Sequence, residues 1–242
     1  MVKKERNRSS ITDGSKQTAE GTRLIFYERF DPFFFIFRIF KEMFMKKGMM
    51  TLVMFLTLPL FADISANFSF TTNYVWRGMT QTMDDPGYSG GFDYTDDSGF
   101  YAGTWGSNVA FGGAGLELDT YVGYSGTAEE GFDYDIGYID YAYPGTTGDF
   151  EEFYFSASYE GIGFSYYSPL EGDADYLEAF YTDDYVTVSY GDYNTYGTNL
   201  LVAYSFPLMG YDASIGYTSF EAEEGTEMED EDGIVFTLSA SF

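Results

Sequence analysis

From Ala66 onward, apolar and polar residues alternate along the chain with a period of two. Phe68 and Phe70 fall on one face and Ser69 on the other, and the apolar series continues through Tyr74 to Trp76. The last ten residues alternate in the same way. Successive residues of a strand point to opposite faces, so this pattern predicts β-strands and not helices.

The pattern recurs about twelve times, and ten to fourteen strands are compatible with it. Gly-rich or acidic turn sequences separate the segments. We expect strands at about 66–77, 88–95, 100–109, 116–125, 132–143, 151–160, 162–168, 175–182, 185–191, 198–206, 211–220 and 233–242. An even number of antiparallel strands is typical of bacterial single-chain barrels.

The lengths of the connections give a second signal. They are short after the even-numbered segments and mostly longer after the odd-numbered ones. Two exceed ten residues: RGMTQTMDDPG at 77–87 and EAEEGTEMEDEDG at 221–233. A transmembrane barrel whose N-terminus lies in the periplasm has this asymmetry, with short periplasmic turns and longer outer loops.

Alternation alone does not identify the inner face. A soluble barrel would bury the aromatic residues, whereas a membrane barrel turns them toward lipid and surrounds a polar lumen. An export leader, Phe and Tyr near strand ends, and a chain that ends on the apolar-face residue Phe242 favour the second arrangement. We therefore predict an all-β protein, a transmembrane antiparallel β-barrel over residues 63–242, in the outer membrane of a Gram-negative bacterium.

Residues 45–62 have the form of a secretory signal peptide. Lys46 and Lys47 precede fourteen uncharged, mostly apolar residues that end at Ala62. Cleavage after Ala66 is an alternative, and a buried helix is the competing interpretation of the segment. We expect Met45 to be the true start, which leaves residues 1–44 as a mis-start or a disordered extension; a genuine extension or an anchor is the alternative.

Composition narrows the function. The chain has no His and no Cys, which excludes disulfides, Cys-based zinc sites and His-based acid–base catalysis. We expect neither enzymatic activity nor a cofactor or metal site. Residues 63–242 hold one basic residue, Arg77, against 33 acidic ones, a formal charge of −32. Such a surface repels nucleic-acid phosphates, so nucleic acid is not an expected partner.

The stretch 73–108 resembles the N-terminal signature of the TorF porin family. The matching positions are Tyr74, Arg77-Gly78, Gln81, Pro86, Gly90-Gly91-Phe92-Asp93-Tyr94, Ser98-Gly99-Phe100-Tyr101, Gly103, Trp105 and Ser107-Asn108. The resemblance implies a small outer-membrane barrel with porin activity and does not imply a solute. The terminal Phe242 resembles the signal that outer-membrane assembly machinery recognises, so that machinery and outer-membrane lipid are the expected partners.

The polar face is rich in acids. If the apolar face contacts lipid, the inward residues include Asp93, Glu117, Asp119, Asp133, Asp135, Glu152, Glu178 and Asp212. Carboxylates in a pore concentrate cations and exclude anions, so we expect passive diffusion of small, preferably cationic solutes. The alternative is a closed structural or surface-interaction barrel. Arg77 is either a constriction residue that orients solutes or a partner in a structural ion pair.

Overall fold

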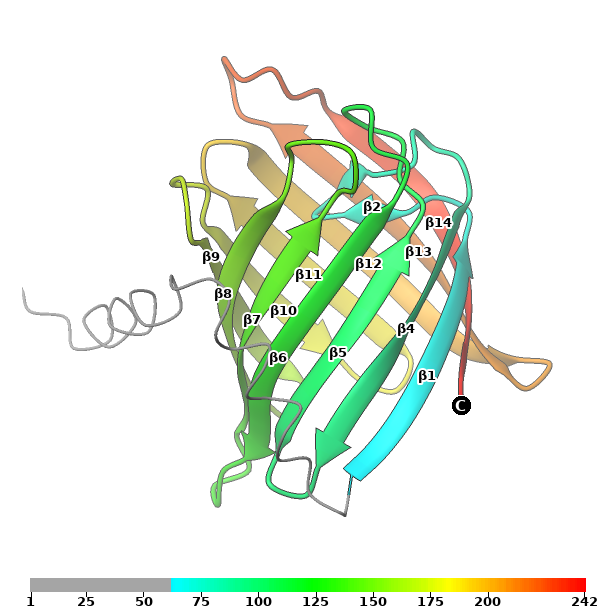
Figure 1. Cartoon of the computed structure of the whole chain (residues 1–242), viewed down its shortest axis with the longest axis vertical. Coiled ribbons are helices and arrows are strands. Elements are labelled where there is room, and N and C mark those ends of the chain that lie inside the picture. The colour runs from blue at the N-terminus through cyan, green and yellow to red at the C-terminus, as the bar shows by residue number, and fades with distance from the viewer. Residues whose placement is uncertain (1–61) are drawn as a thin grey trace, which may run out of the picture. The chain divides into compact units, whose positions relative to one another are not determined.

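The computed structural model describes residues 62–242, in which all regular structure is β-strand. Twelve strands form a closed antiparallel barrel (Figure 1). They are β1 (Ala62–Thr71), β4 (Gly87–Asp96), β5 (Phe100–Ser107), β6 (Glu117–Thr127), β7 (Asp133–Ala142), β8 (Phe150–Tyr159), β9 (Ile162–Pro169), β10 (Tyr176–Thr182), β11 (Val186–Tyr193), β12 (Gly197–Leu208), β13 (Tyr211–Ala222) and β14 (Glu231–Ser241). The prediction of an all-β barrel with about twelve strands is confirmed.

The first strand closes the barrel. Along one side β1 pairs with β4, in a register that runs from Ala62 opposite Asp96 to Thr71 opposite Gly87. Along the other side β1 pairs with β14, with Thr71 opposite Thr237. Every wall strand therefore has two neighbours. Closure leaves no row of unpaired backbone groups, which is the condition for crossing hydrocarbon with strands.

Apolar residues cover the outside of the barrel. Ile64, Phe92 and Ile234 are 76%, 63% and 71% exposed. Buried polar residues such as Ser189 and Thr218 lie inside, on strands whose outward neighbours are apolar. A soluble barrel would have the reverse arrangement. The chain therefore has the architecture of an outer-membrane β-barrel.

Acidic residues on the outward face include Asp140 and its cross-strand partner Glu151. Asp140 of β7 pairs with Thr120 of β6 and Glu151 of β8 in regular register, so no bulge is present at this position. It is two residues from the end of its strand. The carboxylate therefore lies near the rim of the barrel, where an outward charge costs less than at the centre of the bilayer.

The two rims have connections of different length, as predicted (Figure 1). The short-turn rim has the connections 97–99, 128–132, 160–161, 183–185 and 209–210. The long-loop rim has the connections 72–86, 108–116, 143–149, 170–175, 194–196 and 223–230. Because β1 starts at the short-turn rim, that rim corresponds to the periplasmic side of a membrane barrel. Within residues 62–242, no helix is long and apolar enough to cross a membrane.

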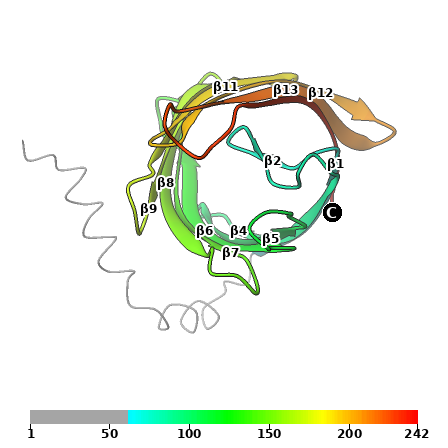
Figure 2. The same cartoon turned by 90° about the horizontal axis from the view of Figure 1, so that it is seen from above.

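The sequence prediction extends beyond the described residues at one place and is wrong at another. The proposed leader and residues 1–44 lie outside the described residues, except for Ala62, which begins β1. The predicted first strand, 66–77, is wrong at its end. The wall strand stops at Thr71, and residues 72–86 turn into the barrel and carry two short strands, β2 (Val75–Trp76) and β3 (Met79–Thr80). Figure 2 shows this segment inside the ring of wall strands.

Inside the wall, tyrosine rings lie over glycines of the adjacent strand. Tyr121 of β6 is directly opposite Gly103 of β5, and Tyr154 of β8 is opposite Gly137 of β7. A Cβ atom added to Gly103 would lie 2.5 Å from three atoms of the Tyr121 side chain. The absent side chain of each glycine leaves the space in which a neighbouring ring packs flat against the wall.

We expect Gly103→Ala to destabilise the barrel by about 1–3 kcal/mol, because the added methyl overpacks against Tyr121. Gly233→Ala on β14 is the matched control, since nothing lies within 4 Å of a Cβ at that position. Urea unfolding of the barrel in lipid vesicles measures both changes in free energy. Equal midpoints for the two variants would contradict this packing.

Candidate functional site

The lumen contains a hairpin that is formed by residues 72–86, here called the lumen hairpin. Its strands pair Val75 with Thr80 and Trp76 with Met79. The two residues of its turn, Arg77 and Gly78, have φ angles of 48° and 84°. Positive φ at both central positions is the signature of a type I′ turn, which matches the twist of a two-residue hairpin. The turn places Arg77 at the tip.

Hydrogen bonds fix the lumen hairpin to itself and to the wall. The Asn73 amide donates to Asp84 at 2.7 Å, and the Thr80 hydroxyl donates to Asn73 at 2.7 Å. The Thr80 backbone N–H donates to the Glu231 carboxylate of β14 at 2.6 Å. At the tip, a Cβ on Gly78 would come within 2.7 Å of Asn199 on β12. The hairpin is therefore held at its base and at its tip.

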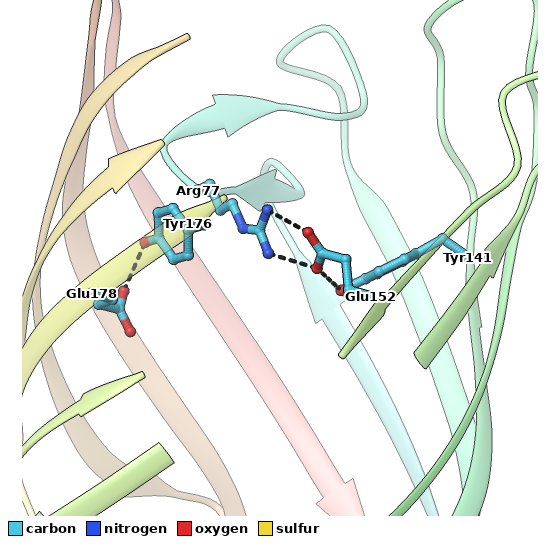
Figure 3. A network of polar contacts seen from close by, with 5 residues as sticks. All are labelled: Arg77, Tyr141, Glu152, Tyr176 and Glu178. Atoms are coloured by element: carbon cyan, nitrogen blue, oxygen red, sulfur yellow. Dashed lines mark hydrogen bonds and ion pairs between the residues drawn. The ribbon is translucent and has the colours of Figure 1, made fainter. Parts of the chain in front are cut away.

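Arg77 reaches across the lumen to Glu152 on β8. Its two terminal nitrogens donate to the two carboxylate oxygens at 2.9 and 2.7 Å, a bidentate pair (Figure 3). The Tyr141 hydroxyl also donates to Glu152, at 3.2 Å. The Arg77 and Glu152 side chains are only 5% and 1% exposed. The structural ion pair anticipated for Arg77 is thus present, and a role in orienting solutes stays a prediction.

Aromatic rings surround the guanidinium of Arg77. Its central carbon lies 4.1 Å from the ring centre of Trp76 and 4.3 Å from that of Tyr176. The rings of Tyr167 and Tyr193 are at 4.9 and 4.8 Å. Cation–π contacts contribute up to about 2 kcal/mol when the cation is desolvated. They offset part of the cost of removing this charge from water.

The groups around Arg77 also affect the charge state of its guanidinium. Burial is the largest single influence and lowers the pKa of the guanidinium, but the Glu152 carboxylate, Tyr141 and Tyr193 together raise it by more, so the net shift is upward. Arg77 therefore stays protonated.

Two predicted lumen acids lie beside one another on β6 and are buried. Glu117 and Asp119 are 2% and 5% exposed. The Tyr74 hydroxyl of the lumen hairpin donates to Glu117 at 3.3 Å. One oxygen of each carboxylate is buried without a hydrogen-bond partner among the described residues. Glu117 thus contacts the lumen hairpin through Tyr74, and neither acid is exposed to a wide channel.

Two other predicted acids are bound by tyrosines. The Asp93 carboxylate accepts hydrogen bonds from the Asn67 amide, at 3.1 Å, and from the Tyr121 hydroxyl. The Tyr101 hydroxyl donates to Asp135 at 2.6 Å and also contacts the Tyr154 hydroxyl. Acids and tyrosines therefore form one polar layer on the lumen side of the wall.

Free volume remains at two levels of the lumen. A cavity of 390 Å³ is lined by Asp133, Asp135 and hydroxyl side chains at the short-turn end of β6–β8. A second cavity, of 460 Å³, is lined by the lumen hairpin, by Glu178 and by polar residues of the wall strands, and we call it the hairpin cavity. The last predicted acid, Asp212, is exposed at the end of β13, apart from both cavities.

Several tyrosines face the lumen although they were not predicted there from the sequence. Aromatic residues were assigned to the outer face, yet Tyr141, Tyr167, Tyr176 and Tyr193 surround the ion pair. The position of these tyrosines in the period-two alternation indicated that they face the lumen. Tyr121, for example, occupies the same parity on β6 as Glu117 and Asp119, which the pattern predicts to face the lumen.

A family model described as "Bacterial protein of unknown function (Gcw_chp)" matches residues 61–232, which include the lumen hairpin and nearly all of the wall. The chain belongs to the Gcw_chp family. The description of the Gcw_chp family assigns no activity, so the resemblance to TorF porins stays a prediction. No curated protein sequence matches the chain.

One solved structure with a weak similarity is that of Ail, the attachment invasion locus protein of Yersinia pestis, in complex with the heparin analogue sucrose octasulfate. The identity is 12%, and the match covers 75% of this chain and 97% of Ail. Its TM-score of 0.16 is too low to support an argument about this Gcw_chp protein.

We expect Glu152→Gln to destabilise the barrel by about 3–5 kcal/mol, because it leaves the Arg77 guanidinium buried without a counter-charge. The double variant Arg77→Met/Glu152→Gln should recover most of that loss, since it removes both charges. Urea unfolding in vesicles gives the coupling free energy. Additive effects of the two substitutions would mean that the pair is not coupled.

Proposed function

We propose that the protein is an outer-membrane pore through which small solutes, preferably cations, diffuse passively. The observation that carries this proposal is polar free volume inside a closed, apolar-coated barrel, in cavities of 460 and 390 Å³. A twelve-strand barrel encloses more space than its own side chains fill, because about eight strands suffice for a filled interior. The resemblance to TorF porins supports the same function.

The charge of the lumen supports a preference for cations. Arg77 is the one basic residue between Asp63 and Phe242, and Glu152 neutralises it. The carboxylates of Asp133 and Asp135 line the cavity nearest the short-turn rim. A lumen with this balance has a negative potential, which concentrates cations and excludes anions.

A closed barrel is the second candidate, and one observation favours it. The lumen hairpin crosses the interior, and its tip is fixed by a buried ion pair and four aromatic rings. If that layer fills the cross-section, the protein has a structural or surface-interaction role. The two functions differ in whether ions cross at this level.

Planar bilayers separate the two functions. With the barrel inserted, we expect discrete conductance steps and a reversal potential that indicates cation selectivity across a salt gradient. Absence of current at high protein load would support the closed barrel, and anion selectivity would refute the role of the carboxylates. We also expect Arg77→Ala/Glu152→Ala to increase the step size, because it removes the side chains that span the lumen.

Neutralising Asp133 and Asp135, which line the cavity of 390 Å³, tests the origin of the cation selectivity. We expect Asp133→Asn/Asp135→Asn to reduce the cation-to-anion permeability ratio, because two lumen charges are lost. Asp212→Asn is the control, since it removes an acid that is exposed at a strand end. If Asp212→Asn changes the permeability ratio as much as the double variant does, the acids of the 390 Å³ cavity do not determine selectivity.

A further inference from the structure

Several polar groups that line the hairpin cavity make no hydrogen bond to the described residues. Ser189 and Thr218 are 4% and 6% exposed, and among the described residues their hydroxyls make no hydrogen bond. The Asn199 side-chain oxygen accepts from the Tyr176 hydroxyl at 3.1 Å, while its amide nitrogen donates to no described residue. Buried polar groups normally have partners, so these groups are available to a solute or to water.

The charges of this cavity exclude an anion and accept a hydroxyl donor. Its wall includes one base, Arg77 of the lumen hairpin, and one acid, Glu178 of β10, and Figure 3 shows Glu178 and Glu152 on opposite sides of Arg77. Arg77 is neutralised by Glu152. Glu178 accepts one hydrogen bond, from Tyr176 at 3.0 Å, and its second oxygen has no partner among the described residues. The pair with Glu152 therefore leaves Glu178 as the uncompensated charge of the lining, and it repels an anion, whereas a neutral hydroxyl group can donate to its second oxygen.

Aromatic rings complete the chemistry of the wall. Trp76, Tyr141, Tyr167 and Tyr176 all line the cavity. Ring faces pack against C–H groups, while neighbouring hydroxyls, an amide and a carboxylate bond to O–H groups. This combination matches a compact ring that carries many hydroxyls. The volume of 460 Å³ lies within the range of about 300–1,000 Å³ that is typical of small-molecule sites.

We propose that the hairpin cavity is a binding subsite for a neutral, polyhydroxylated solute of the size of a monosaccharide or disaccharide. The inference rests on the proposed pore only in that solutes must reach the lumen. It is compatible with cation preference, because an acidic lumen excludes anions and admits neutral solutes.

Tryptophan fluorescence tests the subsite without any need for conduction. The chain has two Trp residues, so Trp105→Phe leaves Trp76, which lines the cavity, as the only reporter. The folded barrel, in a detergent without a sugar head group, is titrated with glucose and with maltose. We expect a saturable change in emission with at least one of them, and no such change with arginine, glutamate or glycine.

Variants locate the binding. In the Trp105→Phe background, we expect Asn199→Ala and Glu178→Gln each to weaken sugar binding by about tenfold, the effect of losing one hydrogen bond. Ser158→Ala, a lumen hydroxyl that lines the other cavity, should leave binding unchanged. Heat-modifiable migration on a gel confirms that each variant is folded.

Several results would overturn the subsite: no response to either sugar, a response to arginine or glycine in place of sugar, or sugar binding that Asn199→Ala and Glu178→Gln leave intact. The pore and the subsite fail separately. Sugar binding in detergent by a barrel that is silent in bilayers refutes the pore and supports the subsite. Cation currents from a barrel that binds neither sugar refute the subsite alone.

Discussion

Backbone hydrogen bonding imposes the constraint on which this structure depends. A sheet in hydrocarbon must pair every strand on both sides, because lipid offers no partner for a free N–H or C=O group. Here β1 satisfies that requirement by pairing with both β4 and β14. Once the sheet is closed, alternate residues are committed to lipid or to the lumen. The apolar coat and the polar interior are two results of one closure.

Closure creates a second problem, which is how to fill the interior of a twelve-strand cylinder. Two devices share the task. Tyrosine rings pack flat on glycines of adjacent strands, and their hydroxyls bind acids such as Asp93 and Asp135. The lumen hairpin fills the level above, where Arg77 is satisfied by Glu152 and by aromatic rings. The volume left between these devices is polar, and it is this volume that gives the barrel a potential function.

The sequence predicted the wall well, because lipid on one side and water on the other impose a period of two on each of the twelve strands. It failed at Tyr74 and Trp76, which keep the phase of β1 although the chain has already left the wall. Gly78 was the only local sign of the turn. The acids were assigned to the inner face by parity, but eight acids share that face. The choice of Glu152 as the partner of Arg77 depends on distances in space, which a one-dimensional pattern does not contain.

The lumen hairpin also has a consequence for the order of events during biogenesis. Arg77 precedes Glu152 by 75 positions, and its aromatic neighbours on β10 and β11 are later still in the chain. Contacts between residues so far apart in sequence form late, after the intervening chain has been organised. The lumen hairpin follows β1, which is the first wall strand to be synthesised. β1 nevertheless closes the barrel by pairing with the last wall strand, β14. The Arg77 contacts therefore form only after the chain has been organised through β11, and a chain truncated before β8 lacks the Glu152 carboxylate.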